Sequence, residues 1–335
     1  MLLRLGVILP HVKVFGGVKR FFEIGNLLVA SGHSFTVFTP EGLPPDWFDF
    51  RGNVDVMEKA VSAGCDALFI TEPDFLPLLR KSNARMKVFY AVLQRSSIRK
   101  VAREKDIIVL ANSGRLYDYL GGKSRQNVFK AMGGIDIRKF SFREKEANKP
   151  DEPFTVMVYG RFYRKKKGTL LVVKACERLY KAGYNIKLLL FDAPVDDVAR
   201  TKVKQFTTIV PFEFFVDYPV KDIASLYYKA DVFVSAERNA GWANTAAEAM
   251  ACGVPVIATS SGTEDFVIHE QTGLVVWRHS WFIGRALKKL YADPALRKRF
   301  SISGRAKIEE FTWEKLADTI EALVTPAQEK IPTDH

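Results

Sequence analysis

Residues 231–259 constrain the fold of this chain more than any other stretch. They read DVFVSAERNAGWANTAAEAMACGVPVIAT, with short apolar runs at 232–234 and 254–258. Between the two runs lie a polar loop, 235–244, and an Ala-rich segment, 245–252, that a glycine and a proline end. Strand, loop, helix, glycine stop and strand form a βαβ unit, which normally lies in a parallel sheet. We therefore expect a parallel sheet covered by helices.

The loop of this unit is placed to bind an anion. In a βαβ unit the loop and the helix N-terminus lie at the carboxyl edge of the sheet, where free backbone N–H groups and the helix dipole favour phosphate. We expect Asn244 or Thr245 to cap the helix and Glu248 to lie in its first turn. A crossover helix that binds no ligand has the same pattern, so this stretch alone does not establish a site.

Strands and helices alternate on both sides of a charged linker. Residues 140–153 (FSFREKEANKPDEP) contain two prolines and no apolar period, which is typical of a domain boundary. We expect a first domain over residues 1–145 and a second over 151–311, each a doubly wound parallel sheet of the α/β class. A ligand would then lie in the cleft between their carboxyl edges.

Length and composition are those of a soluble protein. The chain has 335 residues, 47% hydrophobic and 26% charged, and its three cysteines lack metal-type spacing. The apolar run at the start is too short for a signal peptide or a membrane span, and no other run approaches eighteen residues. We expect a cytoplasmic protein with reduced cysteines.

The positive charge is concentrated in the first half of the chain. The net charge is +12, and residues 1–150 hold 24 Lys and Arg against 15 Asp and Glu. Such an excess indicates an anionic partner, namely a membrane surface, a phosphorylated substrate or nucleic acid, or else only a solvated basic surface. Segment 97–105 (SIRKVAREK) is expected to form a basic amphipathic helix. No helix-turn-helix or aromatic-interleaved motif supports nucleic-acid binding, so we expect none.

A second group of basic residues points to the same sheet edge as the loop. Arg161 ends a predicted strand, and Lys167 directly precedes the next predicted helix, 168–182. An Arg fork, a Lys charge and a helix N-terminus that converge on one place form a diphosphate site. A solvated turn is the alternative interpretation of the basic run 164–167.

The order of these motifs resembles that of the retaining glycosyltransferases with the GT-B fold, the glycosyl transferases group 1 family. The sequence EAMACGVPV at residues 248–256 is the most specific of the motifs. The others are Gly16-Gly17, Gly32-His33, Asn112-Ser113, Gly134-Ile135-Asp136, Phe140, Gly160-Arg161, Lys167-Gly168, Tyr228-Lys229-Ala230-Asp231, Thr272-Gly273-Leu274 and Phe311-Thr312-Trp313. The resemblance covers nearly the whole chain.

The resemblance implies two Rossmann-like domains, an N-terminal one for the acceptor and a C-terminal one for a nucleotide-diphosphate sugar, with a helix at about 312–326 that crosses back to the first. It implies that Arg161 and Lys167 hold the donor diphosphate, that Glu248 binds the ribose, and that the Gly16-Gly17 backbone closes on the phosphates. The remaining donor contacts fall on Gly241, Trp242, Ala243, Asn244 and Thr245. It also implies retention of the anomeric configuration without a metal or other cofactor, and we find no DxD motif or His/Cys cluster.

This chain departs from the family pattern in the donor loop. The family has Glu, seven residues, then Glu, but the first position here is Ala240. Glu237, three residues earlier, could replace it if the loop folds back, and Trp242 could pack on the sugar or plug the core. Further on, the family's Gly-Gly-x-Pro-Glu is replaced by residues 261–265 (SGTED), with Asp265 at the Glu position. The first-domain His of the family has no clear counterpart, although His11 lies near the Gly-Gly loop.

Three functions remain open on the sequence. The leading one is a hexosyl- or deoxyhexosyltransferase that acts on a glycan or lipid-linked acceptor in cell-surface polysaccharide synthesis, with its basic first domain able to dock on the inner face of the membrane. Ala240 motivates the second, a non-catalytic nucleotide-sugar-binding or scaffold protein on the same fold. The third is an epimerase or phosphorylase of this fold. The sequence shows no lysine in surroundings that would suit a bound cofactor.

Overall fold

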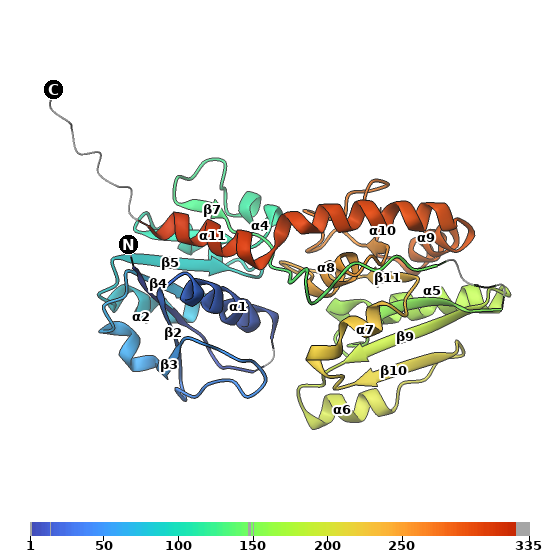
Figure 1. The fold of residues 1–335 in the computed structure, drawn as a ribbon, viewed down its shortest axis with the longest axis horizontal. Coiled ribbons are helices and arrows are strands. Elements are labelled where there is room, and N and C mark those ends of the chain that lie inside the picture. Colours follow the sequence, from blue (N-terminus) through green and yellow to red (C-terminus); the bar gives the residue numbers. More distant parts are fainter. Residues whose placement is uncertain (1, 14, 147–148, 150, 326–335) are drawn as a thin grey trace. The chain divides into compact units, whose positions relative to one another are not determined.

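The chain folds into two compact units, each built on its own parallel sheet (Figure 1). The structure is a computed structural model and describes residues 2–13, 15–146, 149 and 151–325. Unit 1 combines residues 1–134 with the C-terminal segment from 313, and unit 2 comprises residues 135–312.

Unit 1 contains a seven-stranded parallel sheet in the order β3-β2-β1-β4-β5-β6-β7. Its strands are β1 (Arg4–Ile8), β2 (Ser34–Thr39), β3 (Asn53–Val56), β4 (Ala67–Ile70), β5 (Met86–Ala91), β6 (Ile107–Ala111) and β7 (Val128–Lys130). Its α-helices are α1 (Gly16–Ala30), α2 (Leu76–Lys81), α3 (Ile98–Val101), α4 (Gly114–Tyr119) and α11 (Trp313–Val324). The central strands are buried on both faces, as their continuous apolar runs require.

The C-terminal helix α11 belongs to the core of unit 1. Trp313, Leu316 and Ile320 are buried there with residues of α1. Gly134 makes this packing possible, because it adopts φ +112° and a Cβ at this position would lie 1.9 Å from the Trp313 ring. Only glycine combines that backbone angle with that closeness.

Unit 2 contains a six-stranded parallel sheet in the order β10-β9-β8-β11-β12-β13. Its strands are β8 (Phe154–Tyr159), β9 (Ile186–Asp192), β10 (Phe212–Val216), β11 (Val232–Ser235), β12 (Val256–Ala258) and β13 (Leu274–Val275). Its α-helices are α5 (Thr169–Lys181), α6 (Asp197–Lys204), α7 (Ala224–Tyr227), α8 (Asn244–Ala251), α9 (Ser280–Ala292) and α10 (Pro294–Ile308). The βαβ unit expected at 231–259 is β11–α8–β12, and these strands pair in parallel.

The boundary between the units lies at Gly134 and Ile135, so the expectation of a boundary within 140–153 was wrong. The first residues of that linker pack on the rest of unit 2. The Arg305 guanidinium donates to the backbone oxygens of Phe140 (2.8 Å) and Ala251 (2.7 Å), and the Arg143 N–H donates to Cys252 O. These bonds attach the start of the charged segment to α8 and α10.

Several short elements also differ from expectation. The basic helix expected at 97–105 is only the four-residue α3, and Glu104, beyond its end, pairs with Arg80 of α2 at 2.7 Å. Before β11 the chain forms a 3-10 turn, Val220–Asp222, followed by the short α7. None of the described helices is both long enough and apolar enough to span a bilayer.

Candidate active site

The predicted donor residues of unit 2 gather at the carboxyl edge of its sheet. Arg161 follows β8, Lys167 ends the 3-10 turn between β8 and α5, and Glu237 follows β11. Strands β8 and β11 are hydrogen-bonded neighbours, so their carboxyl ends lie side by side. The sheet order therefore brings these three charged side chains to one place.

Arg161 is held by groups from the adjacent strand β9. Its Nε lies 3.0 Å from Asp192 Oδ1, and its Nη2 donates to Ala193 O at 2.8 Å. Asp192 is buried, and its Oδ2 accepts the Tyr163 hydroxyl at 2.8 Å. Burial and this hydrogen bond to Asp192 raise the pKa of Tyr163 to about 12, so the phenol remains a donor at neutral pH. Asp192 thus fixes the direction of the guanidinium.

Lys167 pairs with Glu237 across the end of the sheet. Its Nζ lies 2.7 Å from Glu237 Oε2 and 5.2 Å from the centre of the Tyr159 ring. The Arg161 guanidinium lies 5.0 Å from the same ring, so one aromatic ring contacts both cations. Burial raises the pKa of Tyr159 far above its usual value, and the ring therefore stays neutral.

A glycine allows this approach of the two segments. Gly168 has φ +72°, and a Cβ at this position would lie 2.1 Å from the backbone oxygen of Ala236. The α5 N-terminus can therefore reach the end of β11, where Glu237 follows, only because residue 168 lacks a side chain.

Glu248 lies in the second turn of α8, not in the first turn as expected. The Tyr227 hydroxyl donates to Glu248 Oε2 at 2.7 Å. Burial and the nearby Glu248 charge raise the pKa of Tyr227 well above its usual value, so the hydroxyl stays protonated and orients the carboxylate. The expected caps were also wrong: the N-cap residue is Ala243, which has no side-chain oxygen. Asn244 and Thr245 are the first two residues of the helix.

The loop before α8 contains buried polar atoms that lack partners. Trp242 packs on Phe266 and Phe311, with ring centroids 4.7 and 5.2 Å apart, so its ring fills the core. Its Nε1, Asn244 Oδ1 and Ser235 Oγ are buried and have no hydrogen-bond partner among the described residues. Such orphan groups are rare in folded proteins and mark places where a water or a ligand supplies the missing bond.

Ala240 is packed tightly where the family has its first Glu. Its N–H donates to Ser261 Oγ at 2.9 Å, and a Cβ on Gly262 would lie 2.8 Å from the Ala240 Cβ. Asn239 adopts φ +61°, which turns the chain between Ala240 and Glu237. Glu237 is the one carboxylate of loop 235–244, and it faces Lys167.

The predicted glycines of the first domain lie at the start of α1 in unit 1. Gly16 is the first helical residue, and a Cβ on Gly17 would meet only Val92, at 4.0 Å. Gly17 therefore does not make the kind of tight approach that Gly168 makes. His11, after β1, and Asn112, after β6, each have one buried polar atom without a partner among the described residues.

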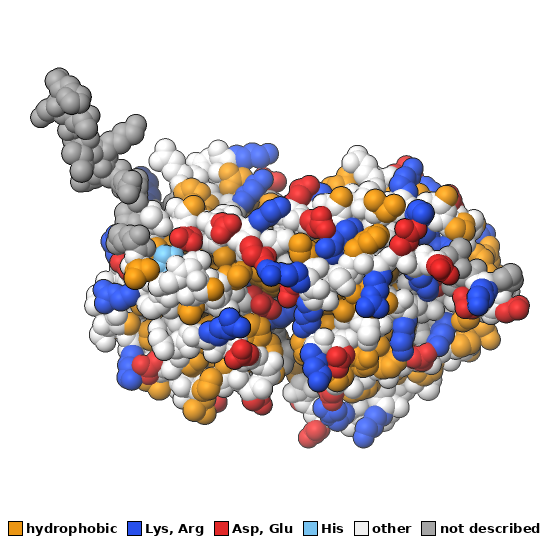
Figure 2. All heavy atoms as spheres, viewed as in Figure 1, with side chains coloured by type: hydrophobic (Ala, Val, Ile, Leu, Met, Phe, Trp, Pro, Cys, Tyr) orange, Lys and Arg blue, Asp and Glu red, His pale blue; other side chains and the backbone are white. Residues whose placement is uncertain are grey.

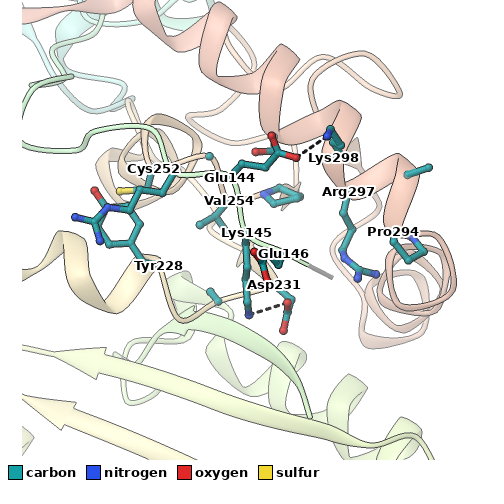
Figure 3. Close-up of a pocket in the computed structure, with 16 residues that line it drawn as sticks. Glu144, Lys145, Glu146, Tyr228, Asp231, Cys252, Val254, Pro294, Arg297 and Lys298 are labelled. Carbon is teal, nitrogen blue, oxygen red and sulfur yellow. Dashed lines mark ion pairs between the residues drawn. The ribbon is translucent and has the colours of Figure 1, made fainter. Parts of the chain in front are cut away.

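A cavity of about 580 Å³ lies at the opposite, amino edge of the unit 2 sheet (Figure 3). Asp231 and residues 253–255, which precede β11 and β12, line it. Four of its charged residues form two ion pairs, Lys145 with Asp231 at 2.7 Å and Lys298 with Glu144 at 2.6 Å. None of the predicted site residues lines this cavity. Among the described residues, no three His, Cys, Asp or Glu side chains gather into a metal-binding group.

Comparison with known families agrees with this architecture. The model of the family described as "Glycosyl transferases group 1" matches residues 139–307, just over half of the chain. The chain belongs to this family.

Curated relatives in the glycosyl transferases group 1 family are moderately similar. The chain is 26% identical over 243 residues to the capsular polysaccharide biosynthesis glycosyltransferase CapM of Staphylococcus aureus, covering 67% of this chain and 63% of CapM. It is 25% identical over 244 residues to a GDP-mannose-dependent monoacylated alpha-(1-6)-phosphatidylinositol monomannoside mannosyltransferase of Corynebacterium glutamicum, covering 68% and 64%. The chain thus spans less than two thirds of the length of these relatives.

Solved structures confirm the GT-B fold. Sucrose-phosphate synthase of Thermosynechococcus elongatus superposes with TM-score 0.78 at 21% identity, over 96% of this chain and 98% of that one. Alr3699/HepE of Anabaena, solved with UDP and glucose, superposes with TM-score 0.75 at 14% identity, over 96% and 99%. The two Rossmann-like parallel sheets of the chain are those of this fold.

Proposed function

We propose that this chain transfers a sugar from a nucleotide-diphosphate sugar to a glycan or lipid-linked acceptor in cell-surface polysaccharide synthesis, with retention of the anomeric configuration. The observation that carries the proposal is the convergence of Arg161, Lys167 and the α8 N-terminus at one edge of the unit 2 sheet. Membership of the family supports it, as do relatives named for capsular polysaccharide synthesis and for a phosphatidylinositol mannoside.

In the proposed mechanism the cations stabilise the departing diphosphate. Arg161 offers a planar fork that the Asp192 carboxylate orients in advance, and Lys167 offers a point charge. Donors that are already oriented toward developing charge lower the barrier without reorganising during the reaction. The leaving diphosphate itself takes the acceptor proton, and no metal or cofactor participates.

Glu248 binds the ribose hydroxyls in this proposal. Glu248→Ala is expected to weaken binding of a nucleoside diphosphate by about 10- to 100-fold, because hydrogen bonds to a carboxylate are among the stronger ones. Tyr227→Phe keeps the carboxylate and removes only the hydroxyl that orients it, so we expect a loss of less than about fivefold. Calorimetric titration measures both, and equal losses in the two variants would contradict the role of Glu248.

Glu237 contacts the donor sugar in place of the missing Glu at position 240. Glu237→Gln is expected to lower kcat/KM for the sugar donor about 10- to 100-fold, while the affinity for the nucleoside diphosphate alone is unchanged or higher. Affinity is retained because the variant removes a negative charge 2.7 Å from Lys167. A matching loss of nucleoside diphosphate affinity would instead assign Glu237 to holding Lys167 in place.

A panel of nucleotide-diphosphate sugars tests the proposal. The correct donor should raise the midpoint of thermal unfolding, and with a suitable acceptor it should give a glycosylated product of unchanged anomeric configuration. The absence of a shift with every donor and nucleotide would count against the site. Binding without hydrolysis or transfer would favour the alternative that Ala240 motivates, a non-catalytic nucleotide-sugar-binding or scaffold protein.

The basic first half motivates a membrane-linked acceptor. An acceptor on a phosphate-bearing lipid would bring the enzyme to anionic headgroups at the inner face of the membrane. On the face drawn in Figure 2, however, Lys and Arg are interspersed with Asp and Glu on both units. Binding to anionic vesicles that weakens with salt is the expected result, and its absence would remove the membrane part of the proposal.

A further inference from the structure

Unit 2 exposes aromatic side chains in the turn between β13 and α9 and in the first turn of α9. Trp277 is 78% exposed, Trp281 50% and Phe282 37%. The Trp281 and Phe282 rings contact each other edge to face, with centroids 4.9 Å apart. Leu170, in the first turn of the neighbouring helix α5, is also exposed. Large apolar side chains gathered on a surface mark an interaction site more often than scattered ones do.

The backbone that carries these rings is firmly held. The Arg278 guanidinium donates to the backbone oxygens of Ala236 (2.8 Å) and Lys165 (2.7 Å), which ties the turn to the end of β11 and to the 3-10 turn before α5. His279 caps α9 by accepting the Trp281 N–H. The aromatic rings are therefore presented on a fixed support, and their exposure does not come from a loose loop.

The elements that flank the turn are rich in Lys and Arg. Helix α9 contains no Asp or Glu; of its cations, Lys289 is paired with Glu270 at 2.6 Å, and Arg285 lies 4.9 Å from the Trp281 ring centre. Residues 161–176, which include Lys165 and Lys166, contain six Lys and Arg and no Asp or Glu. The 3-10 turn of this segment is joined to the aromatic turn by Arg278. A partner surface that complements this patch is therefore anionic.

We propose that the turn from Trp277 to Phe282, with the cations around it, docks unit 2 on the surface of an anionic phospholipid bilayer. Tryptophan rings settle at the level of the headgroups, and Lys and Arg near the surface add attraction to anionic lipids. A membrane fits better than single-stranded nucleic acid, because Arg285 already lies over the Trp281 ring that a base would stack on. This proposal does not depend on sugar transfer.

Co-sedimentation of the full chain with vesicles tests the proposal. Vesicles of phosphatidylcholine with phosphatidylglycerol should bind the chain at least about tenfold more tightly than phosphatidylcholine alone. The double variant Trp277→Ser with Trp281→Ser should lose about tenfold or more of that binding. The matched control is Ile302→Ser, which removes an equally exposed apolar side chain (50%) from α10 and should bind as the unchanged chain does.

Tryptophan fluorescence gives a second readout. Addition of anionic vesicles should shift the emission to the blue in the unchanged chain, and the shift should be absent in the double variant and halved in Trp277→Ser. Unchanged thermal unfolding and nucleoside diphosphate binding in the variants would show that the fold and the donor site are intact. Equal vesicle binding by the double variant, or loss of binding only in Arg99→Ser with Lys100→Ser of unit 1, would overturn the proposal. Binding to single-stranded RNA in preference to vesicles would overturn it as well.

Discussion

Lys167→Ala is expected to lower the rate of sugar transfer by about 10²- to 10³-fold, the loss typical when one oriented donor to a developing charge is removed. Lys167 lies against Glu237 and the Tyr159 ring at the carboxyl edge of the unit 2 sheet. Its charge is therefore fixed where the diphosphate of the donor would bind. The measurement is kcat/KM for the nucleotide-diphosphate sugar with a soluble acceptor.

The nearby residue Lys165 provides the matched control. It belongs to the same 3-10 turn, but its side chain is exposed and has no ion pair among the described residues. Lys165→Ala removes the same charge and should leave kcat/KM within about threefold, as is usual for surface cations. If the two variants lost activity equally, the effect would come from the general positive field of the turn, and the specific role of Lys167 would be wrong.

Gly168→Ala is expected to lower the free energy of unfolding of unit 2 by about 2–5 kcal/mol, from the left-handed backbone and the steric overlap together. A Cβ at residue 168 would lie 2.1 Å from the Ala236 backbone oxygen, which has no flexible end that could move aside. The displaced backbone would also separate Lys167 from Glu237. We therefore expect weaker nucleoside diphosphate binding in the same variant, measured on the protein that remains folded at low temperature.

Gly183→Ala separates the two causes of this destabilisation. Gly183, after the end of α5, has φ +86°, and a Cβ at this position would have no heavy atom within 4 Å. The substitution therefore carries only the backbone cost of about 1–2 kcal/mol. Urea unfolding of both variants gives the comparison. A Gly168→Ala protein no less stable than Gly183→Ala would show that β11 and the α5 N-terminus are not packed as described.

The architecture could be predicted because the central strands are continuous apolar runs and the long helices repeat apolar residues every three to four positions. The βαβ unit of β11, α8 and β12 was expected from a short continuous stretch of chain, and its strands do pair in parallel. The edge strands β3 and β10 were missed, because their side chains are only partly buried and the sequence there lacks a continuous apolar run. Residues 135–146 contact the rest of unit 2 through residues far along the chain, so the domain boundary could not be located from local composition.

The residues that lie at the carboxyl edge of the sheet were predictable from the sequence, but the pairs that they form were not, because those pairs depend on which strands are neighbours. Arg161, Lys167 and Glu237 each follow a strand or precede a helix, so a common edge could be expected. Asp192 was missed, although its place directly after the largely apolar run 186–191 was a usable signal, because its pairing with Arg161 requires β9 to lie beside β8. The role of Tyr227 likewise depends on its contact with Glu248, which is made across the fold.

The central claim is that unit 2 binds a nucleotide-diphosphate sugar at the carboxyl edge of its sheet. The most direct test is a crystal structure of the chain with its nucleotide-diphosphate sugar. We predict the diphosphate within hydrogen-bond distance of Arg161 and Lys167, with the ribose on Glu248 and the sugar beside Glu237. A diphosphate bound elsewhere, such as the amino-edge cavity lined by Arg143 and Arg297, would contradict the account.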